Sequence, residues 1–196
     1  MTTTATTDPR PLYDGALSWA LGVVRGVRPE QLTDATPCTE LDVRGLLSHL
    51  VATVQRAAAL GRGEDAATVP WQAPHPPADD WAGAYADAIE AMWAVWRAPD
   101  ADLDHPVRAP FGTVPGGAAL MAYTCETLVH GWDLAVATDQ DTEADAAVAE
   151  PVLALMQRFL PAEPRGGRVP FAAPVPPREE AGPTERLANW CGRARP

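Results

Sequence analysis

The chain has 196 residues, of which 46% are apolar, and its formal net charge is -11. This length suits one domain with a core of ordinary size. The acidic balance argues against non-specific nucleic-acid binding, which needs a basic surface. No apolar run approaches the roughly 18 residues of a membrane span, so we expect no membrane partner.

Cysteine usage and the N-terminus indicate the compartment. Cys38, Cys125 and Cys191 are far apart and form no Cys-x-x-Cys pair, so free thiols in a reducing compartment are the simplest interpretation. Residues 1–8 are polar and Thr-rich, without the basic start and apolar stretch of a signal peptide. We therefore expect a cytoplasmic protein whose first seven residues are loose.

Apolar residues recur at helical spacing in four long segments. Thr39, three residues before Asp42, is a capping-box-like start for the second of them. Short extended signals on either side of Phe111-Gly112 are typical of a small β-hairpin or an irregular loop over residues 103–115. The four predicted helices span residues 9–27, 40–60, 79–97 and 118–137.

The rest of the chain is predicted to be an appendage of this bundle. A fifth helix is expected over residues 144–160, with a kink or a late restart at Pro151. Pro and Gly crowd residues 161–183, which predicts an extended strap with Phe171 and Val175 as anchors. A last short helix is expected over residues 185–191. The fold class is therefore all-α, with one domain over residues 1–196: a helical bundle over 9–160, then the strap and terminal helix over 161–196.

Three polar residues stand out against the apolar helices. Glu126 and His130 are four residues apart, so they lie one turn apart on the same face of the fourth long helix. Burying both is costly unless something satisfies them. A hydrogen-bonded pair would do so, and so would a divalent metal. His49 lies at the border of the apolar stripe of the second helix and, taken alone, indicates a structural histidine.

Two motif blocks resemble a known family. The segments from Thr36 to Leu50 and from Glu126 to Ala135 are similar to motifs of actinobacterial metal-binding proteins of the DinB-like superfamily, which includes the mycothiol-dependent maleylpyruvate isomerases. The run Phe111 to Gly116 and the segment Arg186 to Gly192 fit the same group. The resemblance implies a DinB-like four-helix bundle that holds a divalent metal through His49, Glu126 and His130.

The resemblance also implies a range of functions. Zinc is the first choice of metal, with nickel, iron, cobalt or manganese as alternatives, and mycothiol is implied as a thiol cofactor. Three protein ligands would leave a position open for a small-molecule substrate or thiol. We therefore expect a metal- and low-molecular-weight-thiol-dependent isomerase or transferase, monomeric or homodimeric. The alternatives are a non-catalytic metal- or ligand-binding module with a structural metal, and a metal-free scaffold.

Four further residues have two interpretations each. Asp133 is expected either to orient a ligand histidine or to serve on the helix surface. Arg44 suits an anionic substrate, but a solvated arginine is the better interpretation. Cys38 lies near the positive end of the second helix, where a thiol of lowered pKa is one interpretation and a structural thiol the favoured one. Cys125 is expected to be a packed thiol rather than a ligand or nucleophile, because it points about 100° away from Glu126 on an ideal helix.

Overall fold

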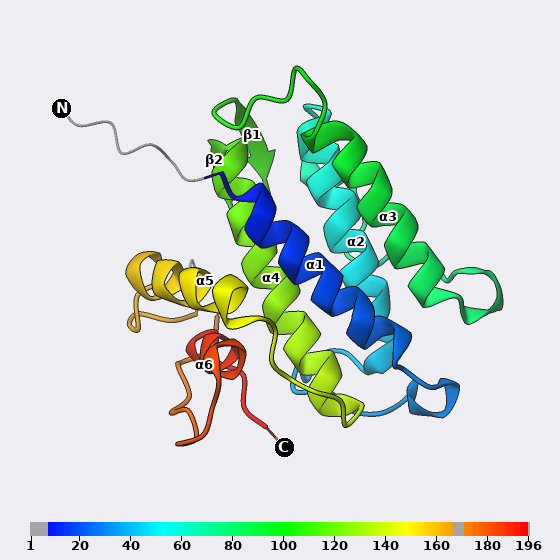
Figure 1. Ribbon diagram of the computed structural model, residues 1–196, viewed down its shortest axis with the longest axis vertical. Helices are drawn as coiled ribbons and strands as arrows, with labels where there is room; N and C mark the ends of the chain where they lie inside the picture. Colours follow the sequence, from blue (N-terminus) through cyan, green and yellow to red (C-terminus); the bar gives the residue numbers. More distant parts are fainter. Residues whose placement is uncertain (1–7, 167–170, 196) are drawn as a thin grey trace.

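A computed structural model describes residues 8–166 and 171–195, and it is mostly helical (Figure 1). Residues 1–7, which we expect to be loose, lie outside the described residues. Four helices form the bundle: α1 (Arg10–Arg25), α2 (Val43–Gly61), α3 (Trp81–Trp96) and α4 (Gly116–Ala137). Helix α2 packs on α3 and α4, and α1 packs on α4 and α3. The predicted four-helix bundle is therefore confirmed.

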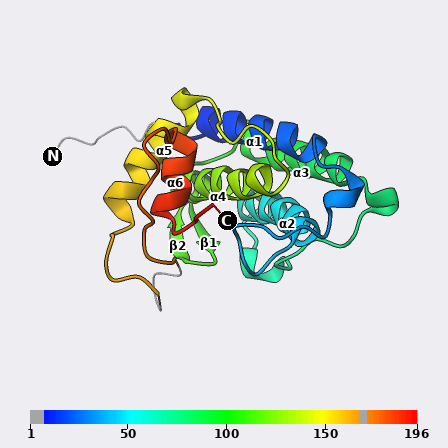
Figure 2. The same ribbon diagram turned by 90° about the horizontal axis from the view of Figure 1, so that it is seen from below.

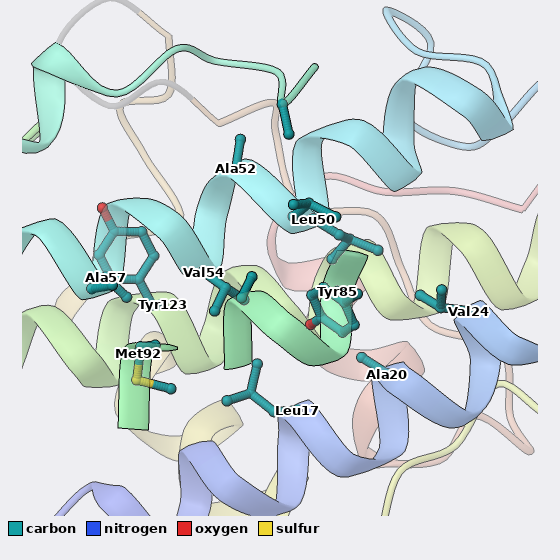
Figure 3. Close-up of a cluster of buried hydrophobic side chains, with 14 of the residues drawn as sticks. Leu17, Ala20, Val24, Leu50, Ala52, Val54, Ala57, Tyr85, Met92 and Tyr123 are labelled. Atoms are coloured by element: carbon teal, nitrogen blue, oxygen red, sulfur yellow. The ribbon is translucent and has the colours of Figure 1, made fainter. Parts of the chain in front are cut away.

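The bundle core is made by the apolar stripes that predicted the helices. Figure 3 shows side chains of α1, α2 and α3 meeting between the helices, with Tyr123 of α4 beside them. Leu17, Leu50, Val54, Tyr85 and Met92 are at most 1% exposed. Burying such a side chain contributes about 1.5–3 kcal/mol. This packing makes the bundle a rigid support for polar groups between α2 and α4.

The second helix begins three residues later than expected. Thr36 donates its hydroxyl to the carbonyl of Leu41, which fixes the preceding residues in turns. The carboxylate of Asp42 accepts a hydrogen bond from the N–H of Gly45 at 2.8 Å and caps the helix. The helix therefore starts at Val43, because an Asp cap satisfies the first free N–H groups there.

A glycine sets the approach of α1 to α4. A Cβ atom on Gly131 would overlap the ring of Trp19, so only glycine lets the two helices come this close. Helices α1 and α4 therefore pack closely at Gly131, the residue that follows His130.

The hairpin between α3 and α4 is confirmed. Strands β1 (Pro106–Ala109) and β2 (Gly112–Pro115) pair antiparallel, with Val107 opposite Val114. The N–H of Gly116 donates to the carbonyl of His105 at 2.9 Å and joins the hairpin to the start of α4.

The C-terminal part packs against α4 as the pair α5 (Ala146–Phe159) and α6 (Pro183–Trp190) (Figures 1 and 2). Helix α5 runs through Pro151 as one element, rather than restarting there. Of the expected strap anchors, Phe171 packs on the apolar cluster of these helices and Val175 donates its N–H to the carbonyl of Asn189. No helix of the described residues is long and apolar enough to cross a membrane.

Glu185 ties the terminal helix to the strap and the tail. Its side chain is 2% exposed and accepts hydrogen bonds from Arg178 Nη2 at 2.6 Å and from Arg195 Nη2 at 3.0 Å. The bonds from Arg178, followed by those from Arg195, lower the pKa of Glu185 to about 2 although burial opposes the shift. The carboxylate is therefore ionised and paired throughout the neutral range.

We expect Glu185→Gln to lower the free energy of unfolding by about 2–3 kcal/mol at pH 7, because it leaves two guanidinium groups without their buried partner. Because the folded-state pKa lies below the ordinary value, this contribution is present above about pH 4.5 and is lost as the pH falls toward 2. Urea denaturation between pH 7 and pH 2.5 measures it.

Glu180→Gln is the matched control, because it removes an exposed carboxylate that pairs with the same Arg178. This control should change the unfolding free energy by less than about 0.5 kcal/mol. Equal effects of the two variants would show that Glu185 is not the anchor.

Candidate metal centre

The three residues expected to bind metal lie together between α2 and α4. His49 comes from α2, and Glu126 and His130 come from successive turns of α4. The Nε2 atom of His49 lies 3.2 Å from Glu126 Oε1, and the Nε2 atom of His130 lies 3.4 Å from the same oxygen. One ligand atom from each residue lies within 4.8 Å of the other two.

The two imidazoles are buried and the carboxylate is not. His49 is 1% exposed and His130 4% exposed, whereas the side chain of Glu126 is 37% exposed. The rings meet nearly at right angles, with centroids 4.8 Å apart. The group therefore reaches solvent on the side of Glu126.

Hydrogen bonds at the other ring nitrogens fix both tautomers. His49 Nδ1 lies 3.1 Å from the carbonyl oxygen of Trp71, and His130 Nδ1 lies 3.0 Å from Asp133 Oδ2. A carbonyl or carboxylate oxygen can only accept, so each Nδ1 must carry the hydrogen. In a neutral ring, Nε2 is then the atom with the free lone pair.

This arrangement fits a bound cation. Two Nε2 lone pairs and a carboxylate oxygen would otherwise point at one another inside a buried interface, which is unfavourable without a proton or a metal. Two imidazole nitrogens and a carboxylate oxygen are a ligand set used by catalytic zinc. Hydrogen-bond acceptors behind both rings are also typical of metal-ligating histidines.

In the metal-free site, a proton can take the place of the cation. Partial burial would raise the pKa of Glu126, but the close contacts with His130 and His49 outweigh it and lower that pKa. Burial would lower the pKa of His130, but Asp133 and Glu126 outweigh it and raise it to about 10. The metal-free site therefore holds an ionised carboxylate beside a protonated His130.

Trp71 belongs to this site, although sequence analysis placed it only in an irregular connection. Its ring lies over His49, with centroids 3.9 Å apart, and it is 46% exposed. Its carbonyl oxygen also orients the ring of His49. A large aromatic residue among prolines is the one signal that could have marked it.

The remaining candidates divide between the site and the packed core. Asp133 is buried and contacts His130 Nδ1, so it does not lie on the helix surface, and its role in orienting a ligand stays a prediction. Cys38 Sγ lies near His130 and Asp133, whereas Cys125 is buried against Cys191, with the two sulfur atoms 4.0 Å apart. Arg44 is exposed, as expected for a solvated side chain.

In chelator-treated protein, we expect His130 to stay protonated between pH 6 and pH 8.5. Its folded-state pKa is raised, so its pairing stabilises the fold fully below about pH 6.5 and loses that effect as the pH rises through about 10. NMR spectra of the ring nitrogens measure the titration, and urea denaturation measures the stability. Titration of His130 near pH 6.5 would contradict this pairing.

Comparison with known proteins identifies the family. The family model for the mycothiol maleylpyruvate isomerase N-terminal domain matches residues 18–135. Two uncharacterized proteins of Mycobacterium tuberculosis, from strains CDC 1551 / Oshkosh and ATCC 25618 / H37Rv, are each 31% identical over 186 residues, covering 95% of this chain and 98% of theirs. No solved structure matches significantly. The chain therefore belongs to the mycothiol maleylpyruvate isomerase N-terminal domain family, whose DinB-like helical fold it shares.

Proposed function

We propose that this protein holds one divalent metal through His49 Nε2, Glu126 and His130 Nε2. The observation that supports this most is the geometry of the two rings: an acceptor oxygen lies behind each Nδ1, and both Nε2 atoms lie within 3.4 Å of the same carboxylate oxygen. Metal binding would replace the proton of His130 and leave the hydrogen bond to Asp133 in place.

The ligand set favours a catalytic rather than a structural metal. Within residues 8–166 and 171–195, no fourth His, Cys, Asp or Glu joins this group. A structural zinc site has four protein ligands, whereas a catalytic site keeps a position for water or substrate. The exposed side of Glu126 and the half-exposed ring of Trp71 mark the side from which a small molecule would enter.

The reaction that fits best is a thiol-dependent isomerisation or transfer on a small-molecule substrate. A bound divalent metal, zinc by first choice, would lower the pKa of a coordinated thiol and favour the nucleophilic thiolate. Mycothiol is the thiol that the family suggests. Trp71 would cover His49 and contact the incoming molecule. Glu126 and His130, which Asp133 orients, would form the polar side of the binding site.

Metal content is the direct test of the ligand set. Protein purified without an affinity tag or chelator should contain about one divalent metal ion per chain, and His49→Ala should contain less than about a tenth of that amount. His75→Ala and His105→Ala are matched controls, because both histidines lie in exposed loop segments. Elemental analysis of the four proteins measures the content. Full occupancy in His49→Ala would contradict the site.

Cobalt spectroscopy tests the open position. We expect a low-molecular-weight thiol, added to the cobalt-loaded protein, to produce a near-ultraviolet thiolate-to-cobalt absorption band and to change the visible spectrum. A Cys38→Ser variant controls for the protein's own thiol that lies near His130. A spectrum that no thiol changes would favour a closed, structural metal in a non-catalytic module.

A further inference from the structure

The C-terminal tail reaches the candidate metal centre through one arginine. Arg193 donates from Nε to Asp133 Oδ2 at 3.0 Å and from Nη2 to Cys38 Sγ at 3.4 Å. Figure 2 shows the tail leaving α6 and running toward α2 and α4. Arg193 lies outside residues 18–135, the part of the chain that the family model matches.

Asp133 depends on this guanidinium. Its side chain is fully buried, and a buried carboxylate without a cationic partner is strongly destabilising. The same oxygen, Oδ2, accepts hydrogen bonds from His130 Nδ1 and from Arg193 Nε. Arg193 therefore fixes the position of Asp133 Oδ2, and this oxygen, placed behind the ring of His130, accepts the hydrogen of Nδ1.

Arg193 also occupies the place of a competing metal site. Cys38, His130 and Asp133 each offer a ligand atom within 4.8 Å of the others, and all three residues are buried. A metal there would share the His130 ring with the first group. The guanidinium contacts two of the three residues, so a fixed positive charge already lies where a second cation would bind.

The backbone of the tail holds Arg193 in place. Gly192 has a φ of +88°, a left-handed conformation that favours glycine. The N–H of Arg193 donates to the carbonyl of Ala188 at 2.9 Å, and Asn189 Nδ2 donates to the carbonyl of Arg193 at 3.0 Å. The side chain is thus presented to Asp133 by a turn that closes α6.

We propose that Arg193 is a positioning residue of the metal centre: through Asp133 it fixes the His130 ring and so selects Nε2, rather than Nδ1, as the metal-binding atom. This inference rests on the proposed function. The C-terminal segment then contributes to the site, and the bundle and this segment form one functional unit rather than a bundle with an independent appendage.

Metal affinity tests the proposal. We expect Arg193→Gln to weaken zinc and cobalt binding about 10- to 100-fold, the usual effect of losing a group that supports a metal ligand. Arg193→Lys keeps the charge and should recover most of the loss. Competition with a chromophoric chelator at pH 7.5 measures the affinities.

Arg195→Gln is the matched control. Arg195 lies two residues away in the same tail and also pairs with a buried carboxylate, Glu185; within the described residues its other recorded contacts are with Thr142 and the ring of Trp132, not with the centre. Its loss should lower the free energy of unfolding without changing metal affinity by more than about twofold. Thermal unfolding of each variant confirms that the proteins compared are folded.

The tautomer of His130 gives a second readout that stability alone would not change. In zinc-loaded wild type, we expect NMR to show a slowly exchanging hydrogen on Nδ1 and zinc on Nε2, and in Arg193→Gln we expect this Nδ1 hydrogen to exchange faster. Unchanged affinity and an unchanged Nδ1 signal in folded Arg193→Gln would overturn the inference alone. Absence of metal binding in wild type would instead overturn the proposed function.

Discussion

The structure depends on one electrostatic constraint: two buried imidazole rings direct Nε2 at the same carboxylate oxygen. His49 and His130 cannot both be neutral in this arrangement without a cation between them and Glu126. A proton on His130 relieves the constraint between that ring and Glu126 in the metal-free protein, and a divalent metal would accept the lone pairs of both rings. The packing of α2 on α4 keeps the two rings and the carboxylate in this arrangement.

The support behind the rings extends well beyond the bundle. The carbonyl of Trp71 fixes His49 from the connection after α2, and Asp133 fixes His130 from the same helix. Asp133 is in turn paired with Arg193, which follows α6. The orientations of the two rings therefore depend on residues from the loop after α2, the bundle and the tail.

Much of the fold and part of the candidate site could be predicted from local sequence patterns. Helical spacing of apolar residues predicted the four helices of the bundle, and Glu126 and His130 were paired by their spacing alone. The resemblance to the DinB-like superfamily supplied His49, because nothing local distinguishes it from a structural histidine. The contacts of Trp71 and Arg193 with the site could not be predicted, since a carbonyl acceptor and a contact made across 60 residues depend on tertiary packing. Helix α2 starts later than its predicted start at residue 40, because Asp42, not Thr39, provides the cap.

X-ray absorption of the zinc-loaded protein tests the central claim most directly. The proposed centre predicts a shell of nitrogen and oxygen ligands at about 2.0–2.1 Å with the scattering of two imidazole rings. Sulfur from Cys38 at about 2.3 Å, or the scattering of a single imidazole, would contradict it, because either result would place the metal elsewhere than between His49 and His130.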